Sequence, residues 1–103
     1  MIKVHEDERV PNGCFQIAST ATVVKCPGNG RIVQFQADGG TIRYRPDGVD
    51  PTNLVVGGTE IGMTLTDKEI HTYVVGDGYD LTQFRFLEGT NGSGAKVTVT
   101  TYK

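Results

Sequence analysis

The sequence predicts an all-β protein, an antiparallel β-sandwich or jelly roll of about eight short strands with little or no helix. Three observations lead to this prediction. Apolar and polar residues alternate with a period of two in several short stretches. The 14 glycines of this 103-residue chain recur every few residues, which suits short strands joined by tight turns. No window of about 11 residues has the apolar spacing of an amphipathic helix without an intervening Gly or Pro.

The chain has the length of one domain with a single core. Residues 1–11 are expected to form an N-terminal arm, and residues 12–103 a single β-sandwich domain. The arm carries a short alternating piece with Ile2 and Val4, then a run of charges, and it ends at a proline. Two interpretations stay open: a solvated terminus, or an extended arm that docks on a neighbouring subunit.

Eight strands are expected after the arm, separated by connectors rich in Gly, Pro, Asn and Asp. In order, they span residues 14–18, 20–26, 31–37, 41–45, 60–65, 69–75, 82–87 and 96–102. Residues 47–58 form the one longer irregular connection. We expect this segment to cross between the two sheets, with residues 54–56 tucked under the sandwich.

Two β-hairpins are predicted from the alternation. If Gly39-Gly40 forms a two-residue turn, Phe35 lies opposite Tyr44, and every cross-strand pair of residues 31–48 matches in polarity. A slip of one residue would turn the apolar set to the wrong face, which favours this register. The same reasoning pairs strand 82–87 with strand 96–102.

The first hairpin would place four polar side chains on one face. They are Gln34, Gln36, Arg43 and Arg45. This face is either a solvated sheet surface or a subunit contact that uses Arg in planar hydrogen bonds. Together with two apolar residues of the arm, these make up the candidate protein-interface residues: Ile2, Val4, Gln34, Gln36, Arg43 and Arg45.

Charge and composition narrow the classes of partner. The formal net charge of −2 provides no electrostatic footprint for a phosphate backbone, so no nucleic-acid partner is expected. No apolar run suits a secretion signal or a membrane span, so we expect a cytoplasm-like compartment and no membrane partner. Cys14 and Cys26 are therefore expected to be buried free thiols rather than a disulfide.

The residues that could carry chemistry do not form a recognisable site. His5 and His71 are far apart and match no metal-binding spacing, and His71 is expected on the polar face of its strand. The carboxylate pairs lie in turns or in the arm, where Asx-turns explain them, although a weak calcium site at residues 76–80 stays open. Ser19 and Ser93 have no His or Asp partners in sight. We therefore expect no enzyme activity, no metal and no cofactor.

One resemblance goes further than these patterns. The run TATVVKCPGNGRIVQFQADGGTIRYRPDGVDPT, with QFRFLEG and a terminal AKVTVTTYK after it, resembles a group of small tailed-bacteriophage structural proteins. Its most specific part is the stretch at residues 42–48, IRYRPDG, with Pro51-Thr52 close behind. The resemblance covers residues 20–102 and brings no catalytic residues with it.

The resemblance implies a virion protein that is assembled in the cytoplasm of the bacterial host. Its expected role is that of a capsid decoration or cement protein, a dimer or trimer that binds the major capsid protein and stabilises the shell. The alternative is a tail or fibre module that binds host-surface carbohydrate through Tyr73, Tyr79 and nearby loops. A third possibility is a hydrolase or isomerase built on a jelly roll, but the sequence contains no acid–base pair with a supporting partner.

Overall fold

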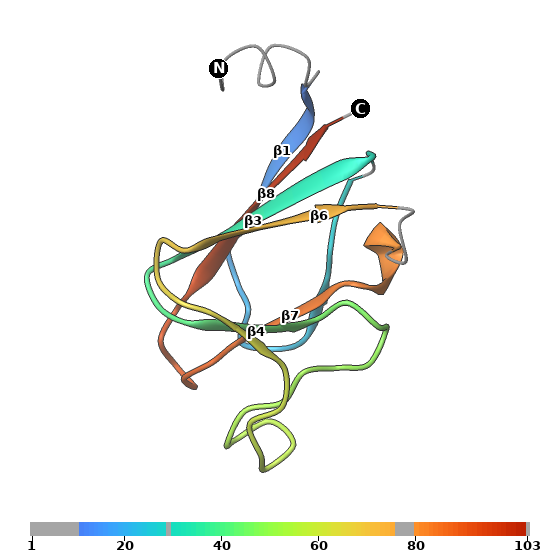
Figure 1. Cartoon of the computed structure of the whole chain (residues 1–103). Helices are drawn as coiled ribbons and strands as arrows, with labels where there is room; N and C mark the ends of the chain where they lie inside the picture. Colours follow the sequence, from blue (N-terminus) through green and yellow to red (C-terminus); the bar gives the residue numbers. More distant parts are fainter. Residues whose placement is uncertain (1–10, 29, 76–79, 103) are drawn as a thin grey trace.

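The computed structural model describes residues 11–28, 30–75 and 80–102 (Figure 1). The predicted arm, with Ile2 and Val4, lies outside these residues, and Pro11 already belongs to the first strand. The described chain contains eight strands and one 3₁₀ turn, with no α-helix. In order, the elements are β1 (Pro11–Ile17), β2 (Val24–Lys25), β3 (Ile32–Asp38), β4 (Ile42–Arg45), β5 (Met63–Leu65), β6 (Ile70–Val74), η1 (Leu81–Gln83), β7 (Arg85–Glu88) and β8 (Lys96–Tyr102).

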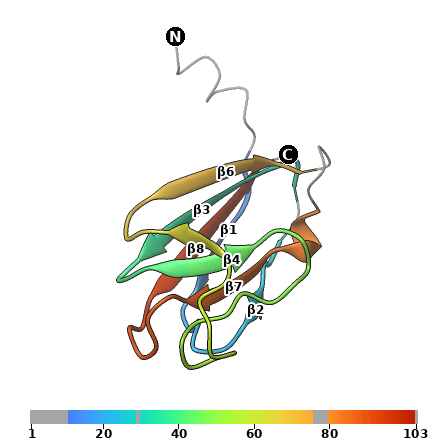
Figure 2. The same cartoon turned by 60° about the horizontal axis from the view of Figure 1, so that its bottom comes forward.

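The strands form two antiparallel four-stranded sheets packed as a sandwich (Figure 2). Sheet A has the order β1-β8-β3-β6, and sheet B has the order β2-β7-β4-β5. The first strand therefore pairs with the last, the second with the seventh, the third with the sixth and the fourth with the fifth. This nested pairing is the strand order of an eight-stranded jelly roll. The predicted fold class is confirmed.

Both predicted hairpins are wrong. β3 lies in sheet A and β4 in sheet B, so Phe35 and Tyr44 do not pair through their backbones. Their rings instead meet across the core, with centroids 5.7 Å apart. Strands β7 and β8 are likewise split between the two sheets. Alternation identifies the inward side chains of a strand, but a hydrogen-bonded hairpin and a corner between facing sheets satisfy it equally well.

The predicted crossover at residues 47–58 is also wrong. The segment joins β4 to β5, which are neighbours in sheet B, and it is the one connection of the jelly roll that stays within a sheet. All other connections pass from one sheet to the other. At the β3–β4 corner, Gly39 and Gly40 have φ angles of 81° and 152°, which lets the chain turn between the sheets.

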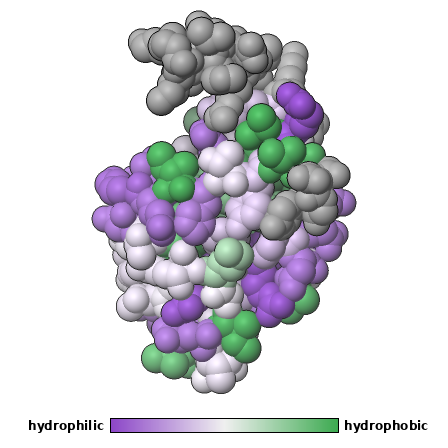
Figure 3. Space-filling model, in the orientation of Figure 1, coloured by the Kyte–Doolittle hydropathy of each residue, from purple (hydrophilic) through white to green (hydrophobic). Residues whose placement is uncertain are grey.

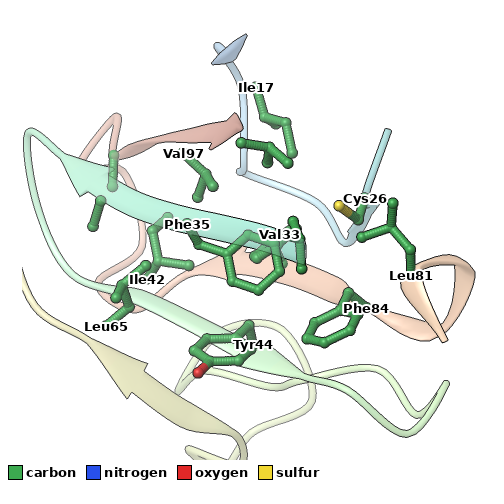
Figure 4. Packing of buried hydrophobic residues seen from close by; sticks show 14 residues of the cluster. Ile17, Cys26, Val33, Phe35, Ile42, Tyr44, Leu65, Leu81, Phe84 and Val97 are labelled. Carbon is green, nitrogen blue, oxygen red and sulfur yellow. The ribbon is translucent and has the colours of Figure 1, made fainter. Parts of the chain in front are cut away.

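The core lies between the two sheets and is built largely from side chains of the central strands (Figure 4). Phe35 of β3 occupies its centre, with ring centroids 5.0 Å from Phe84 and 4.9 Å from Phe86. The remaining core residues are Ile17, Cys26, Val33, Ala37, Ile42, Tyr44, Leu65, Leu81, Ala95, Val97 and Val99. Aromatic rings thus dominate the contact that holds the sheets together.

The inward face of β6 closes one side of the sandwich with polar groups. The hydroxyl of the buried Tyr44 lies 2.6 Å from the Nδ1 atom of His71 and 2.6 Å from the hydroxyl of Tyr73. His71 Nε2 lies 3.4 Å from a carboxylate oxygen of Glu69. The expectation that His71 lies on an outer polar face is wrong, because His71 is opposite the inward Phe35. These groups tie the edge of sheet A to the centre of sheet B.

Candidate functional site

The structure separates the four polar residues that were predicted to share a face. Gln34 and Gln36 lie on the outer face of sheet A, whereas Arg43 and Arg45 lie on the outer face of sheet B. The error follows from the hairpin: once β3 and β4 belong to facing sheets, their outward side chains point in opposite directions.

On sheet A, both glutamines hold local hydrogen bonds. Gln34 accepts a bond from the hydroxyl of Tyr102 (3.1 Å), and Gln36 donates one to the backbone oxygen of Lys68 (3.2 Å). Their cross-strand neighbours include Thr98 and Thr100 of β8. This part of sheet A is therefore an uncharged polar surface.

On sheet B, both arginines are engaged with the β4–β5 loop, defined here as residues 46–62. Arg45 binds the carboxylate of Asp47 with two hydrogen bonds of 3.1 and 2.5 Å. Arg43 donates to the hydroxyl of Thr64 (3.2 Å) and forms an ion pair with Glu60 (3.6 Å). The arginines thus anchor the two ends of the loop to β4.

Asn53 fixes the middle of this loop from a fully buried position. Its side-chain amide donates to the backbone oxygen of Glu88 in β7 (2.9 Å). Its side-chain oxygen accepts hydrogen bonds from the backbone N–H groups of Val55 (3.0 Å) and Val56 (2.6 Å). One side chain therefore both attaches the loop to sheet B and shapes the turn at residues 53–56.

The loop also has a ladder of its own and covers part of sheet B. Thr52 and Ile61 exchange two backbone hydrogen bonds of 2.8 and 3.0 Å. Leu87, which alternates outward between Phe86 and Glu88, is nevertheless fully buried. Pro51 is buried as well. The loop is thus a packed structure on the outside of the sandwich.

The tip of the loop presents apolar side chains to solvent. Leu54 and Val55 are 71% and 65% exposed, and Val49 and Ile61 are also exposed. Figure 3 shows apolar side chains at the lower end of the molecule, where Figure 1 places this loop. The prediction that residues 54–56 tuck under the sandwich is wrong for Leu54 and Val55. We call Leu54 and Val55 the apolar tip; Val49 and Ile61 lie near the two ends of the loop.

Sequence reasoning missed the apolar tip because it treated an apolar run as core. A usable signal was present in Asn53, which precedes the run and is a residue type that accepts hydrogen bonds from the backbone two or three residues further on. Such a turn, followed by Gly57-Gly58 at φ angles of 87° and 76°, forces the run into a reversal rather than a strand.

The remaining candidates for chemistry have structural partners. Asp80 accepts hydrogen bonds from the backbone N–H (3.0 Å) and hydroxyl (2.9 Å) of Thr82 at the start of η1, and these bonds lower its pKa. The guanidinium of Arg45 lowers the pKa of Asp47. Asp77 and Tyr79 lie outside the described residues. Within the described ranges, no three His, Cys, Asp or Glu residues form a metal-binding group, and there is no pocket.

Both cysteines are free thiols, as expected, but only one of them is buried. Burial raises the pKa of Cys26 to about 12, so this thiol stays protonated in the folded protein. Cys14 is exposed on the outer face of sheet A, which contradicts the expectation of two buried thiols. In the part of the chain that the structure covers, no helix has the length and apolar character to cross a membrane.

Comparisons with protein-family models, with curated proteins and with solved structures found no match to this chain.

Proposed function

We propose that this protein is a non-enzymatic bacteriophage virion protein, a capsid decoration or cement protein that binds and stabilises the shell of major capsid protein. The observation that carries the proposal is the apolar tip, the two strongly exposed side chains of Leu54 and Val55 held on a hydrogen-bonded loop. A pre-shaped apolar surface binds protein with little loss of conformational entropy. The fold alone does not assign a role, because jelly rolls serve many functions.

The sequence resemblance and the candidate surface coincide, which supports the particular assignment. The most specific part of the resemblance is residues 42–48 with Pro51-Thr52. In the structure, Arg43, Arg45 and Asp47 of this segment anchor the loop, and Thr52 forms its ladder. The motif residues therefore build the element that presents the apolar tip.

The proposal is tested by adding the purified protein to capsids that lack it. We expect saturable binding that co-sediments with the capsids. The double variant Leu54→Asp/Val55→Asp should reduce the affinity at least tenfold, because burying each of these side chains contributes about 1.5 to 3 kcal/mol. Thr90→Asp/Asn91→Asp places the same two charges in another exposed loop and serves as the control.

Equal loss of binding in both double variants would show only an effect of added charge and would contradict the role of the apolar tip in capsid binding. Failure of the wild-type protein to bind any capsid form would contradict the decoration function. The carbohydrate-binding alternative would then gain support from a specific glycan-array signal. Of the two tyrosines that this alternative names, Tyr73 packs against the core, with its ring 5.1 Å from that of Phe84, and Tyr79 lies outside the described residues.

A further inference from the structure

The four strands at the edges of the two sheets differ in how far they are protected against pairing with another chain. β2 and β5 are short, with two and three residues. β1 begins at a proline and has a register shift between Pro11 and Gly13. Short length, proline and irregular register are devices that block edge-to-edge association. Three of the four edges therefore carry such a device.

β6 carries none of them. It has five residues in regular register with β3, from Ile70 opposite Gln36 to Val74 opposite Ile32. It contains no proline and no Asp, Glu, Lys or Arg. Figure 2 shows β6 as the outermost strand of sheet A, and no other described strand pairs with its free side. Two of its outward side chains, Ile70 and Val74, are 55% and 48% exposed.

The backbone register shows which groups of β6 are available. Val75 donates its N–H to the oxygen of Arg31 (2.6 Å), and the oxygen of Glu69 accepts the N–H of Ala37 (3.4 Å). Backbone groups in an antiparallel ladder alternate in direction, so odd-numbered residues of β6 face β3. The N–H and C=O groups of Ile70, Thr72 and Val74 consequently point away from the sheet.

These residues are arranged symmetrically about Thr72. We propose that two copies of this protein pair through β6 in an antiparallel dimer with Thr72 on the two-fold axis. In this register Thr72 faces Thr72 of the other copy, and each Ile70 faces a Val74. All three pairs use the outward backbone groups, and each pair matches in polarity. The interface is isologous, because one strand is complementary to itself.

We assign the edge to a second copy, rather than to an unrelated strand, because β6 is complementary to itself about Thr72. No like charges meet across the two-fold axis, since none of the residues that face the other copy, Ile70, Thr72 and Val74, is charged. The pairing joins the two copies of sheet A into one eight-stranded sheet. It leaves the apolar tip free, because the tip belongs to the loop of sheet B. The inference is therefore independent of the proposed capsid function.

Sedimentation velocity of the full-length protein over a range of concentrations tests the dimer. We expect a monomer–dimer equilibrium, and the variant Thr72→Lys should raise its dissociation constant about tenfold or more, because two ammonium groups would face each other at the axis. The matched control is Thr98→Lys, on the same outer face but within β8, which is paired on both sides. A wild-type protein that stays monomeric, or a dimer unaffected by Thr72→Lys, would overturn the proposal.

Cross-linking decides the matter if the lysine variant does not fold. Facing residues of a hydrogen-bonded antiparallel pair have Cα atoms about 5.5 Å apart, within the range of a disulfide. In a Cys14→Ser background, which removes the exposed native thiol, Thr72→Cys should give a covalent dimer on mild oxidation and Thr98→Cys should not. Absence of a covalent dimer in the Thr72→Cys variant contradicts the symmetric pairing. A dimer lost only on Ile2→Asp/Val4→Asp would place the N-terminal segment on the edge instead and would also contradict it.

These results are separable from those of the capsid assay. A monomer that binds capsids refutes the β6 dimer alone, and a dimer that binds none refutes the decoration function alone.

Discussion

At the scale of single residues, Asn53 determines the shape of the candidate surface. Its amide and its side-chain oxygen satisfy three backbone groups, one on β7 and two within the turn. A buried backbone group that loses its partner costs about 1 to 3 kcal/mol. The apolar tip is therefore held in place by a polar residue that lies beneath it, out of contact with solvent.

Replacing Asn53 by Ala should destabilise the protein by about 2 to 4 kcal/mol, because the oxygen of Glu88 and the N–H groups of Val55 and Val56 lose their partners. Chemical denaturation followed by circular dichroism measures the change in the free energy of unfolding. The exposed Asn91 supplies the control, since Asn91→Ala should change this free energy by less than about 0.5 kcal/mol. Similar effects of the two substitutions would contradict the role of Asn53.

At the scale of elements, the positions of the strands were predictable and their partners were not. Each of the eight predicted strands overlaps an observed one, but the strand predicted at residues 20–26 is reduced to the two residues of β2, the one at 60–65 to the three of β5, and residues 82–83 belong to η1. Period-2 alternation is a local property and identifies these segments well. Pairing is not local: Phe35 faces Tyr44 both in the predicted hairpin and across the actual sandwich, so polarity matching could not distinguish the two arrangements.

The candidate surface was predictable only in part. Arg43 and Arg45 were among the predicted interface residues, and in the structure they anchor the loop that presents the apolar tip. Leu54 and Val55 were assigned to the interior, because an apolar side chain usually contributes to a core. Asn53 and Gly57-Gly58 indicate the turn locally, but one hydrogen bond from Asn53 to the backbone oxygen of Glu88, 35 positions away, attaches it to sheet B. A contact between residues so distant in the sequence leaves no local pattern.

The corner between β3 and β4 gives a prediction at this scale. Gly40 has a φ angle of 152°, and a Cβ atom there would lie 3.2 Å from that of Ala95. Gly40→Ala should therefore lower the free energy of unfolding by about 1 to 3 kcal/mol. At Gly39, with a φ angle of 81°, the nearest atom to an added Cβ is the backbone oxygen of Gly94 at 4.0 Å, so Gly39→Asn is the milder control. Thermal and chemical denaturation of both variants provide the comparison. A Gly40→Ala variant with an unchanged free energy of unfolding would contradict the backbone strain and close contact inferred at this corner.

At the scale of the whole molecule, surface carboxylates make stability depend on pH. The pKa values of four groups lie below their ordinary range: those of Asp38, Asp47, Glu69 and Asp80. The largest cause is a hydrogen bond in each case, from Lys68, Arg45, Thr66 and Thr82 respectively. A carboxyl group with a lowered pKa in the folded state stabilises the fold above its unfolded pKa, and this contribution disappears as the pH falls through the folded value.

We therefore expect the midpoint of urea denaturation to fall as the pH is lowered from about 5 to about 2. Asp47→Asn should reduce this fall, because its carboxylate no longer titrates against Arg45. The comparison requires denaturation curves of both proteins across that pH range. An identical pH dependence in the variant would show that the Arg45–Asp47 pair does not contribute to the acid response.

The molecule as a whole is a jelly roll that carries an apolar loop tip on sheet B and an unprotected strand on the edge of sheet A. The most direct test of its proposed role is the number of copies per particle, measured by quantitative mass spectrometry on purified virions of a bacteriophage whose genome carries its gene. A shell component should be present in hundreds of copies, in fixed proportion to the major capsid protein. A few copies per particle, or none, would contradict the account.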